Sequence, residues 1–134
     1  MNRNARKPNH MFKYCLITLA FSAIGNAAMA QSNDCGVKVT SAVAYSIADR
    51  FKIEFTNTHY SKTVSTIEFR ILIRDGFDKI IGEQTEIWEE GMDSPIKPGK
   101  SEYILRKSKT DDMSRVSAYV VRVRYSDGSK CYED

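Results

Sequence analysis

Residues 51–56 read Phe-Lys-Ile-Glu-Phe-Thr, and apolar and polar side chains alternate through this stretch without a break. Successive side chains of an extended chain point to opposite faces, so the spacing predicts a β-strand with one buried face and one solvated face. Residues 67–74 and 119–125 repeat the pattern. Together these three stretches predict an all-β fold.

Weaker strand signals occupy the rest of the chain. They lie over residues 37–47, 79–88, 101–107 and 130–133. Residues 79–88 have no common apolar phase and contain Gly82, so we expect one or two short edge strands there. Val64 is out of phase with residues 67–74, which predicts a bulge near Ser65. Asp127-Gly128 predicts a two-residue hairpin turn.

The number and spacing of these segments favour one antiparallel β-sandwich of about seven strands, since no stretch shows a sustained 3.6-residue period. Pro98-Gly99 before a strand and the Tyr-Ser-Asp-Gly hairpin at 125–128 resemble features of bacterial extracytoplasmic immunoglobulin-like, or fibronectin-III-like, domains. The resemblance implies a fold and no particular activity. It departs from antibody domains, whose two cysteines lie on central strands.

The first thirty residues predict an export signal. They contain Arg3, Arg6, Lys7 and Lys13 but no acidic residue, and an apolar run follows Lys13. This order of charge and hydrophobicity is typical of a secretory signal peptide. A membrane anchor is the alternative, but the apolar run has about 15 residues whereas a spanning helix needs about 20.

The apolar run ends at Ala28-Met29-Ala30, which fits the small-x-small pattern of signal peptidase, so cleavage would leave Gln31 at the N-terminus. We therefore predict a signal peptide over 1–30, with Met11 as an alternative start, and a β-domain over 31–134. The expected location is periplasmic or secreted, with no stable membrane anchor in the mature form.

Removal of the signal changes the charge of the protein. The full chain has 20 basic and 17 acidic residues, a net charge of +3. Four of the basic residues lie in the predicted signal, so 16 basic and 17 acidic residues remain and the net charge becomes −1. The mature chain thus lacks the basic excess that nucleic-acid binding would require, and we predict no nucleic-acid partner.

Two of the three cysteines remain after cleavage, Cys35 and Cys131. In an oxidising compartment they predict a disulfide that closes a loop across most of the domain, worth about 4–5 kcal/mol in the chain-entropy description. Two free thiols or an intermolecular bridge are the alternatives. A zinc site is disfavoured because only His59 remains to join the two cysteines.

Candidates for catalysis are few. His59 and Ser61 lie two residues apart in a polar turn, where an exposed loop histidine is the simpler interpretation. Carboxylates gather around Trp88 without the spacing of a calcium loop, and they indicate a solvated acidic edge or an acidic patch centred on the tryptophan. These carboxylates are Glu83, Glu86, Glu89, Glu90 and Asp93. We predict no catalytic residues, no metal and no cofactor.

The arginines suggest a partner face. Arg70 and Arg74 share one strand face, and Arg122 and Arg124 share another. In an immunoglobulin-like order the third and sixth strands are neighbours, so the four side chains could form a basic stripe for an acidic partner. Leu72 and Val120 would be apolar points within this stripe. The alternative is cross-strand pairing with Glu68 or Glu54.

These observations favour a non-catalytic binding module whose partner is another protein, such as an inhibitor or immunity protein. A structural subunit of a periplasmic or surface assembly is the main alternative. A carbohydrate-active enzyme that uses the acidic cluster is the third.

Overall fold

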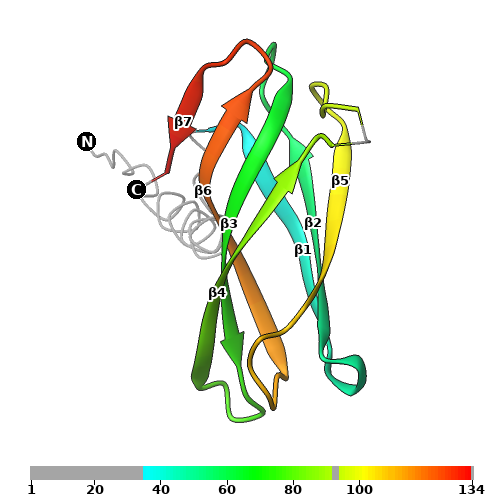
Figure 1. The fold of residues 1–134 in the computed structure, drawn as a ribbon, viewed down its shortest axis with the longest axis vertical. Helices are drawn as coiled ribbons and strands as arrows, with labels where there is room; N and C mark the ends of the chain where they lie inside the picture. The colour runs from blue at the N-terminus through cyan, green and yellow to red at the C-terminus, as the bar shows by residue number, and fades with distance from the viewer. Residues whose placement is uncertain (1–34, 92–93, 134) are drawn as a thin grey trace, which may run out of the picture. The chain divides into compact units, whose positions relative to one another are not determined.

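The computed structural model describes residues 35–91 and 94–133, so the predicted signal and its cleavage site at Ala28, Ala30 and Gln31 lie outside the described residues. The described residues fold into seven strands and one short 3-10 helix (Figure 1). The strands are β1 (Val37–Tyr45), β2 (Arg50–Asn57), β3 (Val64–Arg74), β4 (Ile80–Glu89), β5 (Ser101–Lys107), β6 (Arg115–Tyr125) and β7 (Lys130–Tyr132), and the helix η2 (Ser46–Ala48) joins β1 to β2.

All strand pairs are antiparallel and form two sheets, ordered β1-β2-β5 and β4-β3-β6-β7. The two sheets face each other as the layers of a sandwich (Figure 1). This confirms the predicted all-β, seven-stranded fold. It also confirms that the third and sixth strands are neighbours.

The core lies between the sheets and uses the alternation that the sequence shows. Phe51, Ile53 and Phe55 of β2 are fully buried. The Phe55 ring meets Phe69 of β3 at 5.0 Å and Trp88 of β4 at 6.0 Å between ring centroids. Burial of each such side chain stabilises the fold by about 1.5–3 kcal/mol, so the inward faces of β2 and β3 supply much of the driving force.

Several strands contain bulges that shift the alternation. The register of β3 against β6 shifts between Val64 and Thr66, which confirms the predicted bulge near Ser65. A second shift lies between Val39 and Ser41 in β1. It turns Val43 and Tyr45 outward, where they are 42% and 45% exposed, although an unbroken alternation from the buried Val37 would have placed them inside.

Two local predictions need correction. The segment predicted over 79–88 forms one ten-residue edge strand, β4 (Ile80–Glu89), and not one or two short strands. The loop after β6 is longer than a two-residue turn, because Tyr125 N–H donates to the carbonyl of Ser129 and Gly128 N–H donates to the carbonyl of Tyr125. Only Gly128 in this loop has a positive φ, of 86°, as expected for a three-residue loop that ends in a bulge.

The disulfide joins the beginning of the domain to its last strand. Cys35 is bonded to Cys131 with a Cα–Cα distance of 5.5 Å, as predicted. Next to it, the Tyr125 hydroxyl donates a 2.6 Å hydrogen bond to the carbonyl of Cys35. The two contacts fix the segment before β1 against β6 and β7.

Candidate partner-binding face

The outward side chains of the four-stranded sheet form one continuous face, which we call the arginine face. Its rows follow from the strand register. The top row is Glu89, Thr66, Arg124 and Lys130; the next is Ile87, Glu68, Arg122 and Tyr132; then come Thr85, Arg70 and Tyr119, and below them Glu83, Leu72 and Ser117. Arg74 lies at the lower end, opposite Arg115.

The four predicted arginines thus come from adjacent strands, but most are already engaged. The Arg122 guanidinium pairs with Glu68, as the alternative prediction of cross-strand pairing had it. Arg70 pairs with Glu83 on β4 at 2.7 Å. Arg74 donates to the carbonyl of Asp78. Because these contacts are largely exposed, each contributes at most about 1 kcal/mol, and a partner could replace them at little cost.

Val120 does not belong to this face, so that part of the prediction is wrong. It is 3% exposed and packs in the core. The register of β3 against β6 shifts between Glu68 and Phe69, where an extra β6 residue, Val121, is accommodated. This bulge reverses the alternation, so Val120 points inward while Arg122 still points outward. Leu72 does lie on the outer side, but its neighbours leave it only 9% exposed.

The upper part of the face contains a shallow depression. It is lined by Thr66, Glu68, Ile87, Glu89, Arg122, Arg124 and Lys130. Among the described residues, neither Arg124 nor Lys130 has an ion-pair partner, and the two lie directly opposite each other across β6 and β7. Like charges in this position repel, and an anionic group in the depression would relieve the repulsion.

Exposed apolar and aromatic side chains lie in the two rows below these cations. Ile87 is 44%, Tyr119 39% and Tyr132 61% exposed. The Arg122 guanidinium lies 5.9 Å from the centroid of the Tyr132 ring. Tyrosine and arginine together are typical of the energetically important centres of protein interfaces. Sequence reasoning missed the two tyrosines and Lys130, because only the β6–β7 pairing brings Tyr132 and Lys130 beside the arginines.

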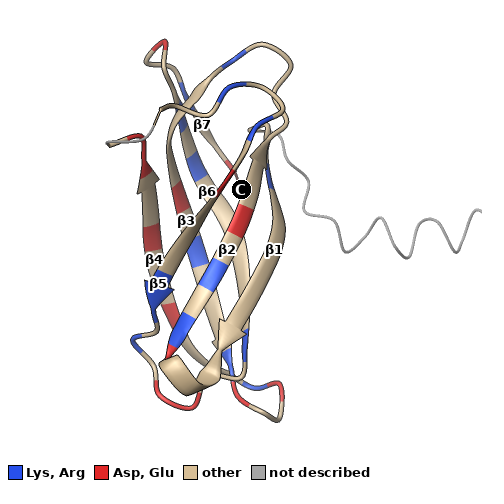
Figure 2. Ribbon diagram, turned by 90° about the vertical axis from the view of Figure 1, so that its right-hand side faces the viewer, with Lys and Arg blue, Asp and Glu red and all other residues tan. Residues whose placement is uncertain are grey.

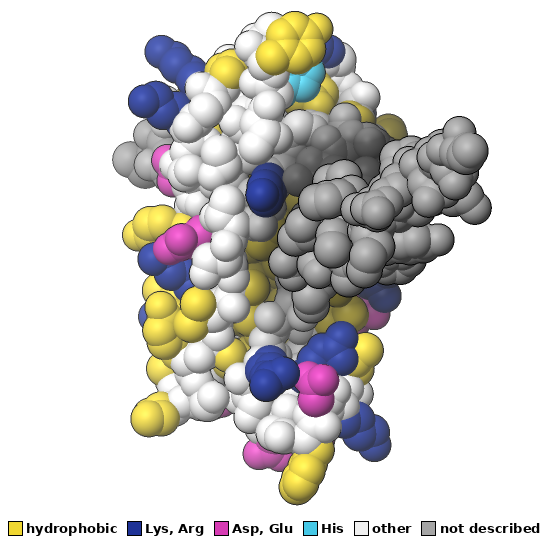
Figure 3. Space-filling view, turned by 180° about the vertical axis from the view of Figure 1, so that it is seen from behind, with side chains coloured by type: hydrophobic (Ala, Val, Ile, Leu, Met, Phe, Trp, Pro, Cys, Tyr) yellow, Lys and Arg dark blue, Asp and Glu magenta, His cyan; other side chains and the backbone are white. Residues whose placement is uncertain are grey.

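Charges of both signs are interspersed along the strands of the two sheets (Figure 2). Scattered hydrophobic side chains reach the surface in the view from behind Figure 1 (Figure 3). The outer face of the three-stranded sheet exposes Val43, Tyr45, Tyr103 and Leu105 around the Lys52–Glu54 ion pair. This second face follows from the bulge in β1, and the sequence pattern did not predict it.

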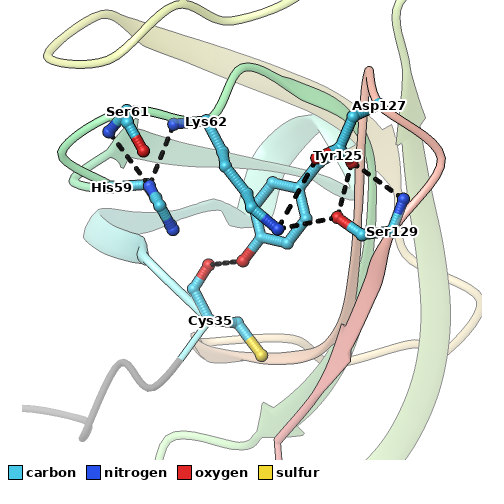
Figure 4. Close-up of polar contacts among 7 residues, drawn as sticks. All are labelled: Cys35, His59, Ser61, Lys62, Tyr125, Asp127 and Ser129. Carbon is cyan, nitrogen blue, oxygen red and sulfur yellow. Dashed lines mark hydrogen bonds and ion pairs between the residues drawn. The ribbon is translucent and has the colours of Figure 1, made fainter.

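His59 and Ser61 belong to a polar network at the disulfide end (Figure 4). His59 Nδ1 accepts hydrogen bonds from the backbone N–H groups of Ser61 and Lys62. Backbone N–H groups, and not the Ser61 hydroxyl, thus occupy Nδ1, so this nitrogen is not arranged as a base for the serine. The histidine instead fixes the turn between β2 and β3.

The Lys62 ammonium reaches from this turn to the β6–β7 hairpin. It donates to the Ser129 hydroxyl at 2.9 Å and lies 3.6 Å from the Asp127 carboxylate (Figure 4). Ser129 donates its own proton to Asp127. Hydrogen bonds from Ser129 hold the pKa of the Asp127 carboxyl below its ordinary range, with Lys62 acting in the same direction. The Ser129 hydroxyl therefore donates its hydrogen bond to a carboxylate. The network links the β2–β3 turn to the β6–β7 hairpin.

The acidic residues around Trp88 do not form the patch that the sequence suggested. Trp88 is 5% exposed and belongs to the core, so no exposed aromatic lies at their centre. Glu83 pairs with Arg70 and Glu86 with Arg106. Asp93 lies outside the described residues. Within 35–91 and 94–133, no three His, Cys, Asp or Glu side chains are grouped so that they could hold a metal ion.

Comparisons with known proteins assign no relative. No protein-family model matches the chain, and no curated protein is similar to it. In the part of the chain that the structure describes, no helix has the length and hydrophobicity needed to cross a membrane.

Proposed function

We propose that this protein is an exported, non-catalytic binding module that acts on another protein through the arginine face. The observation that supports this best is the set of exposed Tyr119, Tyr132 and Ile87 side chains on one face with Arg122 and Arg124. Arg124 has no ion-pair partner in the part of the chain that the structure describes. Such a face offers rigid aromatic contact area together with charge.

The chemistry of the face favours an acidic partner surface. Arg124 and Lys130 repel each other in the free protein, so an anionic side chain placed between them would gain attraction and remove repulsion. An inhibitor or immunity protein that covers an acidic active-site cleft would meet this condition. The depression between β4 and β7 would receive one protruding side chain of that partner.

The predicted location fits the disulfide. Disulfides persist in oxidising compartments, and Cys35–Cys131 links segments that a reducing cytoplasm would leave free. Together with the charged and apolar pattern of residues 1–30, this supports export to the periplasm or beyond.

We propose also that the sandwich is fibronectin-III-like within the wider immunoglobulin-like class. Seven strands divided three and four, with the third strand beside the sixth, support this. In constant-type immunoglobulin domains the fourth strand joins the sheet of the first two, whereas β4 here pairs with β3. The terminal position of the disulfide is a second difference from antibody domains.

The test compares two cation pairs that occupy equivalent positions on the two sheets. Arg124→Ala/Lys130→Ala removes the pair on the arginine face, and Arg50→Ala/Lys107→Ala removes a register pair of exposed cations on the three-stranded sheet. Each protein is immobilised and exposed to periplasmic extract, and captured proteins are identified. We expect one specific partner that the first variant loses and the second retains.

Three results would contradict the proposal. Capture of no specific protein would count against a binding module. Loss of the partner by Arg50→Ala/Lys107→Ala alone would assign binding to the three-stranded sheet. Equal retention by both variants would show that neither cation pair contributes.

A further inference from the structure

The two seams where the sheets meet are closed in different ways. At the β4–β5 seam, side chains replace the missing backbone pairing. The buried Gln84 amide donates to the carbonyl of Lys107 and accepts from the N–H of Lys109. Arg106 donates to the carbonyl of Ile87 and pairs with Glu86. This edge of the sandwich is therefore sealed against another strand.

The β1–β6 seam lacks such a seal among the described residues. β1 pairs only with β2, and it packs beside β6 without pairing to it. β7 covers only the upper part of β6 (Figure 1). The lowest backbone hydrogen bond on this side of β6, among the described residues, runs from Glu133 N–H to the carbonyl of Val121. Below Val121, no described strand pairs with this side of β6.

The backbone of lower β6 offers a row of free hydrogen-bonding groups. Glu90 N–H donates to the carbonyl of Ser65, so the backbone groups of odd-numbered β3 residues face β4 and those of even-numbered ones face β6. The register pairs Arg70–Tyr119 and Leu72–Ser117 are therefore hydrogen-bonded pairs. Backbone groups alternate in direction along a strand, so those of Val116 and Ala118 point away from β3. An unpaired row of this kind is a template for one further strand.

The seam is also shaped to receive the side chains of such a strand. A groove at its lower end is lined by Ala42, Ala44, Val116 and Ser117, among others. Ala118 lies next in β6 and is only partly buried against the core. The alanine and serine side chains are small, and Val116 is already buried between the sheets. An added strand could therefore place larger apolar groups at this seam.

We propose that lower β6 accepts an extended segment of another protein as an added strand, antiparallel to β6 and in line with β7. This goes beyond the arginine face and does not depend on it. Inward positions of the added strand are apolar, and its C-terminal end carries an acidic residue. The acidic residue is placed at that end because Arg74 and Arg115 line the lower end of the groove. The carboxylate of Asp78 lines it as well and is already paired with Arg115.

The probe is a synthetic seven-residue peptide, Thr-Val-Thr-Val-Thr-Val-Glu, added to the purified protein at millimolar concentration. Amide hydrogen exchange of Val116 and Ala118 is followed by NMR. We expect exchange of both amides to slow by about tenfold or more, because added-strand bonds protect them. A peptide N-methylated at the amides that face β6 serves as the matched control and should give no protection.

A second arm tests the charge at the end of the strand. Arg115→Glu should weaken protection by the Glu-ended peptide by about fivefold or more, whereas Arg50→Glu, on the other sheet, should leave it unchanged. Arg124→Ala/Lys130→Ala should also leave it unchanged, which separates this edge from the arginine face.

Unchanged exchange at Val116 and Ala118 with the peptide would overturn the proposal, as would equal protection by the N-methylated peptide. Protection that rises with protein concentration in the absence of peptide would assign the edge to a second copy of this chain, and it would equally overturn the proposal.

Discussion

Replacement of Asn57 by alanine should destabilise the domain more than any other single polar deletion at the disulfide end. The Asn57 side chain is fully buried at the end of β2. Its amide donates to the carbonyls of Lys62 at 2.9 Å and Ile96 at 2.8 Å, and its side-chain oxygen accepts from the N–H of His59 at 2.9 Å. One side chain thus holds the β2–β3 turn and the segment before β5.

Three hydrogen bonds at roughly 1 kcal/mol each give a loss of about 3 kcal/mol, and the buried groups left without partners add to it. For a domain of this size, such a loss corresponds to a fall in Tm of about 15 °C. A typical domain is stable by only about 5–15 kcal/mol, so the effect is a large share of the total.

The assay is urea unfolding followed by the fluorescence of Trp88. It is the single tryptophan of the chain and is 5% exposed in the fold, so unfolding should shift its emission to the red. Thr56→Ala is the matched control, since Thr56 is adjacent in β2 and makes one exposed 2.6 Å hydrogen bond to Ser101. We expect the control to lose less than about 1 kcal/mol.

The account would be refuted if Asn57→Ala lost no more stability than Thr56→Ala. A second variant, Asn57→Asp, keeps the shape but directs a carboxylate at two carbonyls. Burial and this repulsion raise the pKa of the introduced carboxyl above its unfolded value. Its neutral form is favoured in the fold, so the variant should regain stability as the pH falls and lose it as the pH rises through the folded pKa.

Three further predictions concern the disulfide, Tyr125 and the bulge in β6. Cys35→Ala/Cys131→Ala should lower the free energy of unfolding by up to about 4–5 kcal/mol, because the bond spans 96 residues, and urea titration should show a much lower midpoint. Tyr125→Phe should lose about 1 kcal/mol at neutral pH. Burial raises the pKa of the Tyr125 hydroxyl, so its contribution to the free energy of unfolding is complete below the unfolded pKa of about 10 and is lost as the pH rises through the folded pKa. The difference in unfolding free energy between wild type and Tyr125→Phe should therefore shrink in alkaline titrations. Val120→Thr should cost about 1–3 kcal/mol by burying a hydroxyl, whereas Val121→Thr should be nearly neutral, and equal losses would place both side chains in the core.

Strands with one apolar and one polar face were predictable from sequence, as β2 and β3 show. β4 was harder to recognise because two of its inward positions are polar. Gln84 and Glu86 point toward the β4–β5 seam and bond to β5 and its following loop, so no simple alternation marks the strand. Local patterns cannot reveal a polar side chain that is buried in order to satisfy the backbone of a distant strand.

The candidate face was predictable in part. Arginines on adjacent strands followed from the expected strand order, but the inward turn of Val120 did not, because a bulge depends on the register against β3 and leaves no local sign in a run of valines. The role of Asn57 was hidden for a similar reason. An asparagine before a polar segment favours a turn, and only the tertiary structure brings Ile96 to it.

The position of the disulfide has a mechanical consequence. Tension applied to the chain before Cys35 and after Cys131 passes directly through the sulfur–sulfur bond, since the two Cα atoms are 5.5 Å apart. The strands between these residues then carry no load, and the sandwich cannot be unzipped from its ends. Such a domain could transmit force between two attachments while its sheets and exposed surfaces kept their shape, and reduction of one bond would convert it into an extensible chain.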